Sequence, residues 1–172
     1  MKKIVMLAIM LIGVMVIGGC SRGNEQPKLE DSLSGIVDKI YAEKNTNLSL
    51  TTMNVNIKDA NELSYYTGLS NNSKITEAVV SESALGSQAY SMVLVRLKDT
   101  KDAKEVANLM KDNINTRKWV CVGADDVRVA AYGDVVLFIM TSTEFENSAS
   151  AKDITEAFKK VCGGNLAIDM AK

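Results

Sequence analysis

The strongest constraint on the fold is an almost uninterrupted apolar stretch, residues 90–97, which reads Tyr-Ser-Met-Val-Leu-Val-Arg-Leu. Successive side chains of a strand point to opposite faces of its sheet, so this strand presents apolar groups to both faces as far as Arg96. Such strands are usually central and are covered on both sides, or on one side plus an edge. The stretch therefore predicts the central strand of a sheet.

Further strands are predicted on either side of it in the chain. Residues 127–131 alternate apolar and polar positions, residues 132–134 (Tyr-Gly-Asp) suit a turn, and residues 135–141 are apolar again, which predicts a hairpin with a three-residue turn. Residues 75–81 suit another strand, and residues 51–57 a short strand or extended segment.

Helices are indicated by apolar side chains spaced three and four apart and by capping residues. The spacing predicts a helix within residues 28–44 and another that begins near Asp99. Asp59 is placed to cap a short helix that Gly68 closes, and Ser150 with Asp153 has the spacing of a capping box before the last helix.

Composition favours one ordinary domain. The chain has 172 residues, of which 24% are charged and one is proline, and this excludes a disordered or collagen-like protein. We expect residues 28–172 to form a single α+β domain. Its sheet should have about four mostly antiparallel strands, packed against two or three helices on one face.

The N-terminus has the pattern of an export signal. Two lysines precede residues 4–17, which carry no charge, and Gly18-Gly19-Cys20 follows. This order resembles a bacterial lipoprotein signal, in which the cysteine thiol receives diacylglycerol and becomes the new N-terminus. We expect a signal peptide at 1–19, lipid attachment at Cys20 and a tether at 20–27. An uncleaved anchor helix is the less favoured alternative, because the apolar run is shorter than a membrane span requires.

Two stretches carry a resemblance to a known family. They are Ala-Tyr-Ser-Met-Val-Leu-Val-Arg at 89–96, followed by Lys-Asp at 98–99, and Arg-Lys-Trp-Val-Cys-Val at 117–122, which continues through Ala-Asp-Asp to Tyr-Gly-Asp-Val-Val at 132–136. Over residues 30–162 the chain resembles the lipoproteins of clostridia-like Gram-positive bacteria classed as domain-of-unknown-function family 4358. The resemblance implies a lipid anchor and an extracytoplasmic domain, and it implies no reaction or ligand.

The charge balance and the absence of histidine argue against several classes of function. Twenty basic residues stand against 21 acidic ones, so we expect no nucleic-acid partner. Without histidine there is no His-containing triad or zinc site, and neither a calcium-loop spacing nor a phosphate-binding glycine motif is present. We expect no metal, no cofactor and no catalytic residues.

Candidate site residues remain with alternatives open. Cys121 and Cys162 could form a disulfide in an exported chain or could be free thiols. Tyr65, Tyr66, Arg117 and Trp119 could form a binding surface; the favoured alternative packs the aromatic rings into the core and leaves the flanking charges solvated.

The favoured function is a non-catalytic binding or accessory module. It would be lipid-anchored to the cell membrane, would face outside the cytoplasm and would bind an envelope protein or component. The alternatives are a small-ligand capture module for a transporter and, less favoured, a hydrolase that uses carboxylates alone.

Overall fold

Six antiparallel strands form one sheet in the computed structural model, which describes residues 26–144 and 149–172. From one edge to the other the strands are β1 (Leu50–Asn54), β2 (Ile75–Ser83), β3 (Tyr90–Leu97), β5 (Val135–Thr141), β4 (Asp126–Tyr132) and β6 (Ile168–Ala171). The α+β class is confirmed, and so is the interior place of β3. The predicted number of strands is wrong, because β1 and β6 add an edge strand on each side.

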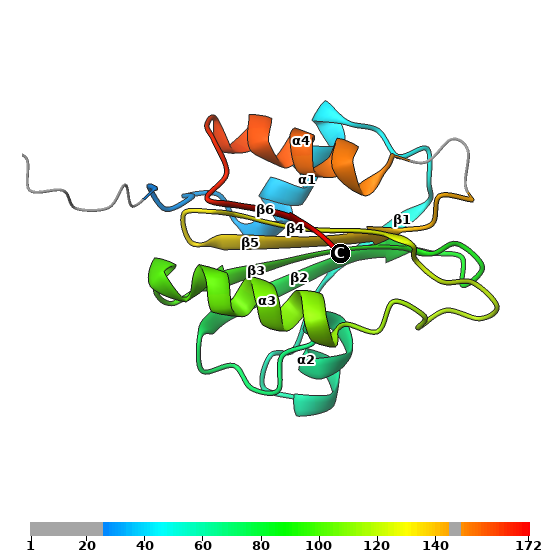
Figure 1. Cartoon of the computed structure of the whole chain (residues 1–172), viewed down its shortest axis with the longest axis horizontal. Helices are drawn as coiled ribbons and strands as arrows, with labels where there is room; N and C mark the ends of the chain where they lie inside the picture. The colour runs from blue at the N-terminus through cyan, green and yellow to red at the C-terminus, as the bar shows by residue number, and fades with distance from the viewer. Residues whose placement is uncertain (1–25, 145–148) are drawn as a thin grey trace, which may run out of the picture.

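Helices cover both faces of the sheet (Figure 1). The helices α1 (Leu33–Glu43) and α4 (Ala151–Cys162) pack on one face, and α2 (Ala60–Thr67) and α3 (Ala103–Asn113) pack on the other. A 3₁₀ turn, Thr100–Asp102, leads into α3. The expectation of helices on one face is therefore wrong. Its physical reason lies in the central strands: every residue of β5 and all of β3 except Arg96 are buried, and both faces need an apolar cover.

Local chemistry sets the helix ends as the sequence predicts. Asp59 accepts hydrogen bonds from the first backbone amides of α2, and Ser150 with Asp153 forms the complete capping box of α4. Gly68 and Gly163 end α2 and α4 at a φ of 70°, in the left-handed region where a residue without Cβ is favoured.

The β4–β5 hairpin has a two-residue turn, Gly133-Asp134, because Tyr132 pairs directly with Val135. The predicted three-residue turn is one residue too long. Gly133 has a φ of 54°, as the tight hairpin turn requires. A Cβ at this position would lie 2.2 Å from the carbonyl oxygen of Pro27, so the N-terminal segment passes directly over the turn.

The hairpin defines two ends of the sheet that matter for function. At the hairpin end lie the Gly133-Asp134 turn, the start of β2 and the end of β3; at the loop end lie the end of β2, the start of β3, the end of β5 and the connection from α3 to β4 (residues 115–125). Figure 1 places the hairpin end and the N-terminal segment at the left, and the connection at the right.

The predicted signal peptide and Cys20 lie outside the described residues, as does all of the predicted tether except Gln26 and Pro27. Within residues 26–144 and 149–172, no helix combines the length and apolarity needed to cross a membrane.

Candidate functional site

A buried lysine fixes the connection between α3 and β4 at the loop end. The Lys118 side chain is 1% exposed, and its ammonium group donates to the Glu82 carboxylate at the end of β2. It also donates to the Ser91 hydroxyl at 3.3 Å, and Ser91 donates to the same carboxylate at 2.7 Å. The charge is thus compensated by an acid and a hydroxyl from two neighbouring strands, as a buried charge requires.

Three aromatic rings surround the same ammonium group. Its nitrogen lies 5.0 Å from the ring centre of Tyr65, 5.2 Å from that of Tyr66 and 5.5 Å from that of Trp119. These distances are those of cation–π attraction, which strengthens when the cation is removed from water. Burial lowers the pKa of Lys118 below its usual value, against the opposing effect of the Glu82 carboxylate.

The two tyrosines come from the last turn of α2. Their ring centres are 4.8 Å apart with an interplanar angle of 88°, the edge-to-face arrangement that aromatic pairs prefer. Partial burial raises the pKa of both phenols, and the negative charge of Glu82 acts in the same direction. The cluster therefore joins α2, the β2–β3 strand pair and the connection from α3 to β4.

The predicted binding residues thus separate into two groups. Tyr65, Tyr66 and Trp119 come together around Lys118, and Trp119 also packs against the core, but the rings surround a lysine of the same chain. Lys118 was expected to be a solvated flanking charge, and that expectation is wrong. Its partner Glu82 is 36 residues away in the chain, so no local pattern could have indicated the pair.

Arg117 makes none of the contacts of this cluster and lines an open, polar pocket with a cavity volume of about 330 Å³. Cys121, Asp125 and Glu144 line the same pocket. The Asp125 carboxylate accepts hydrogen bonds from the hydroxyl and backbone amide of Thr143, at 2.6 and 2.7 Å, and these bonds lower the pKa of Asp125.

Among the described residues that line the pocket, the Cys121 thiol has no hydrogen bond to an acid or a base. Cys121 is an exposed free thiol with a φ of 64°, a strained conformation for a residue with a side chain. Ser91 and Lys118 form a hydroxyl–amine pair nearby, but Ser91 is fully buried, so a substrate has no access to it. Within the part of the chain that the structure describes, no group of three or more Cys, Asp or Glu side chains is arranged to hold a metal ion.

Exposed apolar side chains also concentrate at the loop end. Of the large apolar side chains among the described residues, the three most exposed are Val120 at 74%, Leu85 at 53% and Tyr65 at 50%. Val120 follows Trp119, Leu85 lies in the connection between β2 and β3, and Tyr65 contacts Lys118. Apolar groups gathered on one end of a protein, with charged groups beside them, are typical of an interaction surface.

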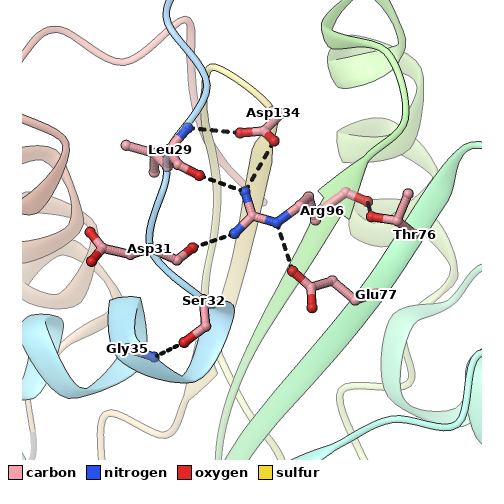
Figure 2. Close-up of polar contacts among 8 residues, drawn as sticks. All are labelled: Leu29, Asp31, Ser32, Gly35, Thr76, Glu77, Arg96 and Asp134. Atoms are coloured by element: carbon pink, nitrogen blue, oxygen red, sulfur yellow. Dashed lines mark hydrogen bonds and ion pairs between the residues drawn. The ribbon is translucent and has the colours of Figure 1, made fainter.

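A second polar network lies at the hairpin end, where Arg96 binds the N-terminal segment (Figure 2). Its guanidinium donates to Asp134 Oδ2 at 3.0 Å, to Glu77 Oε1 at 2.6 Å and to the carbonyl oxygens of Leu29 and Asp31, at 2.9 and 2.5 Å. The Leu29 amide donates in turn to Asp134 Oδ1 at 3.0 Å. No local sequence pattern indicates this network, because its members lie up to 105 residues apart.

The two cysteines for which a disulfide and free thiols were both left open are free thiols in this structure. Cys121 is exposed at the pocket, whereas Cys162 is buried at the end of α4 beneath the other face of the sheet. Burial raises the pKa of the Cys162 thiol to about 12.

No protein-family model, curated protein or solved structure matches this chain in the three comparisons made.

Proposed function

We propose that the protein is an exported, lipid-anchored binding module whose loop end contacts another extracytoplasmic protein. The observation that carries the proposal is the gathering of exposed apolar side chains at that end. Val120, Leu85 and Tyr65 are at least half exposed, and the charged groups Arg117, Asp125 and Glu144 lie on the same end as a polar rim.

The contacts of Lys118 support a binding role because they hold the connection at residues 115–125, which carries Val120, in one conformation. A connection held by an ion pair and three aromatic rings loses little conformational entropy when a partner binds next to it. Connecting segments held by a rigid scaffold commonly carry binding residues. The export signal and Cys20, read from the sequence, supply the proposed location at the membrane.

Site-specific photo-crosslinking in intact cells tests the proposal. A photoreactive residue at position 120 should capture one partner, whereas the same residue at position 156, exposed on α4, should not. Leu85→Asp should weaken the capture, and Cys20→Ala should abolish it by releasing the protein from the membrane. Identical products from positions 120 and 156 would contradict the proposed surface.

A second candidate, capture of a small solute, draws on the polar pocket. Its volume of about 330 Å³ lies at the lower end of the range for ligand pockets, and Arg117 brings a positive charge to it. A ligand screen by thermal unfolding tests this function, since a bound solute raises the melting temperature by mass action. The shift should be lost in Arg117→Ala, and a screen without any shift would leave the protein-binding role.

A further inference from the structure

Strand β1 forms one edge of the sheet, and among the described residues no strand pairs with its outer side. On its inner side the ladder continues past the strand, where the Val55 amide donates to the carbonyl oxygen of Ala78 at 2.9 Å. Residues that bond to the neighbouring strand alternate along an antiparallel strand. The backbone amides and carbonyl groups of Leu50, Thr52 and Asn54 therefore point outward, away from β2.

The two edges of this sheet differ in how they are protected against pairing. Natural edge strands are usually protected by charged side chains, by proline, by a bulge or by a very short length. The opposite edge strand, β6, has four residues and contains Asp169, which forms an ion pair with Arg128 at 2.7 Å. In β1 the register is regular and four of the five residues are exposed, and residues 45–57 contain neither a charge nor a proline. The β1 edge is therefore open to another strand.

The absence of charge favours a second copy of this chain as the occupant of the edge. In a two-fold symmetric pair a residue near the axis lies opposite itself, so a charged residue there would face an equal charge. Residues 45–57 avoid this repulsion although 24% of the whole chain is charged. The charge that precedes this stretch, Lys44, is already paired with Asp153 at 3.2 Å.

One register uses all three residues whose backbone groups point outward. In this register Thr52 pairs with Thr52 of the second copy, and Leu50 of each copy pairs with Asn54 of the other. Each of these pairs exchanges two backbone hydrogen bonds, as hydrogen-bonded pairs of antiparallel strands do. Threonine opposite threonine is also a favourable cross-strand pair.

The neighbouring registers need amides that are already bonded. A strand displaced by two residues in one direction would use the Leu48 amide, which donates to Thr46 Oγ1 at 3.3 Å. Displaced in the other direction, it would use the Asn56 amide, which donates to Glu62 Oε1 at 2.7 Å. The structure therefore favours the register centred on Thr52.

The same register covers an exposed apolar side chain. Met53 is 41% exposed, and side-chain alternation places it on the face of Val55, which is the face that carries α2 and α3. When Thr52 lies on the axis, the two copies of Met53 are diagonal neighbours. Diagonal neighbours lie about 7–8 Å apart, a distance that long side chains bridge.

We propose that β1 is a dimerisation edge. Two copies of the chain pair antiparallel through β1 about a two-fold axis at Thr52, and their two six-stranded sheets become one continuous sheet. The proposal depends neither on the lipid anchor at Cys20 nor on the binding surface at the loop end.

Disulfide trapping tests the register in the full chain, purified in detergent. In a Cys121→Ser background, Thr52→Cys should form an intermolecular disulfide on oxidation, because the Cα atoms of a hydrogen-bonded pair are about 5.5 Å apart. Thr51→Cys is the matched control. It is exposed on the same strand but lies opposite Met53 of the second copy, so the two Cα atoms at position 51 are about 7–8 Å apart and beyond disulfide reach.

We expect severalfold more disulfide-linked dimer from position 52 than from position 51. The Cys121→Ser protein without either change gives the background. Equal amounts of dimer from both positions, in protein that circular dichroism shows to be folded, would overturn the proposed pairing.

Charge substitutions at the axis test the same pairing without a thiol. Thr52→Lys and Thr52→Glu each place equal charges opposite one another, so each protein alone should be a monomer by light scattering after size exclusion. A mixture of the two should again have the mass of two chains, as the unchanged protein should, because an ammonium group then lies opposite a carboxylate.

Unchanged protein with the mass of one chain at the concentration used for trapping would overturn the proposal. So would a mixture that remains monomeric while the unchanged protein is a dimer, because the axis then lies elsewhere. Trapping of Thr52→Cys by a different protein in intact cells, without the linked dimer, would assign the β1 edge to that protein and overturn self-pairing.

Discussion

Replacing Arg96 with methionine removes the group that fastens the N-terminal segment to the hairpin end. The substitution keeps most of the apolar stem but deletes every guanidinium donor. It leaves the Asp134 carboxylate, whose side chain is 5% exposed, without its cation. Removing one partner of a buried ion pair costs about 3–5 kcal/mol, because the remaining charge stays uncompensated.

Two features place the expected cost near the lower bound of that range. Asp134 keeps the hydrogen bond from the Leu29 amide, and the Arg96 side chain is itself 16% exposed, so water reaches part of the network. We therefore expect Arg96→Met to lower the free energy of unfolding by about 3 kcal/mol. Glu77→Gln is the matched control. The Glu77 carboxylate is 46% exposed, and exposed ion pairs contribute only about 0–1 kcal/mol.

Urea denaturation followed by circular dichroism measures both changes. With a slope of about 1–3 kcal/mol per molar urea, Arg96→Met should lower the midpoint by about 1–3 M. Hydrogen exchange at the Leu29 amide should also become faster, since its acceptor on Asp134 loses its fixed position. Adding Asp134→Asn should recover part of the loss because the uncompensated charge is then gone. An Arg96→Met protein as stable as Glu77→Gln would refute the reasoning.

Three further outcomes follow from single positions. Gly133→Ala should lower the free energy of unfolding by more than about 1 kcal/mol, measured in urea, because its φ of 54° is strained for alanine and the new Cβ meets the N-terminal segment. Hydrogen bonds from Thr143 lower the pKa of Asp125 below its usual value of 3.8. These bonds therefore stabilise the folded protein fully above pH 3.8, and the stabilisation is lost as the pH falls through the folded-state pKa. An NMR titration of the Asp125 carboxyl group, compared with the same titration of Thr143→Val, measures the shift. A thiol reagent should modify Cys121 in the native protein but Cys162 only on unfolding, because the latter thiol is buried and its pKa is raised to about 12.

Local rules predicted the elements of this fold well because their causes are local. A carboxylate or hydroxyl before a helix satisfies its first amides, and this holds for Asp59 and Ser150 without reference to the rest of the chain. Glycine after a helix permits the left-handed residue that ends it, as at Gly68. The predicted strands at 75–81, 90–97, 127–131 and 135–141 correspond to β2, β3, β4 and β5.

The arrangement of the elements was harder to predict, because it depends on contacts between distant segments. The apolar pattern of β3 and β5 was compatible with helices on one face or on both, and it does not say which helices cover each face. The edge strand β6 has four residues, and its pairing with β4 aligns Ile168 with Ala131, 37 positions away. A short strand of this kind becomes stable only when its partner is in place.

The two polar networks show what the apolar core leaves undetermined. The core accounts for a stable sheet between two helix pairs, yet it does not determine where the N-terminal segment joins the fold or which path residues 115–125 follow. Arg96 holds the N-terminal segment, and Lys118 holds residues 115–125; each acts together with groups from distant parts of the chain. A buried ion pair is weak support for stability compared with an apolar replacement of the same volume, but it is selective for one arrangement of its partners. The charged groups at the two ends therefore serve mainly to position the N-terminal segment and the connection at residues 115–125, the two parts of the molecule on which the proposed anchoring and binding depend.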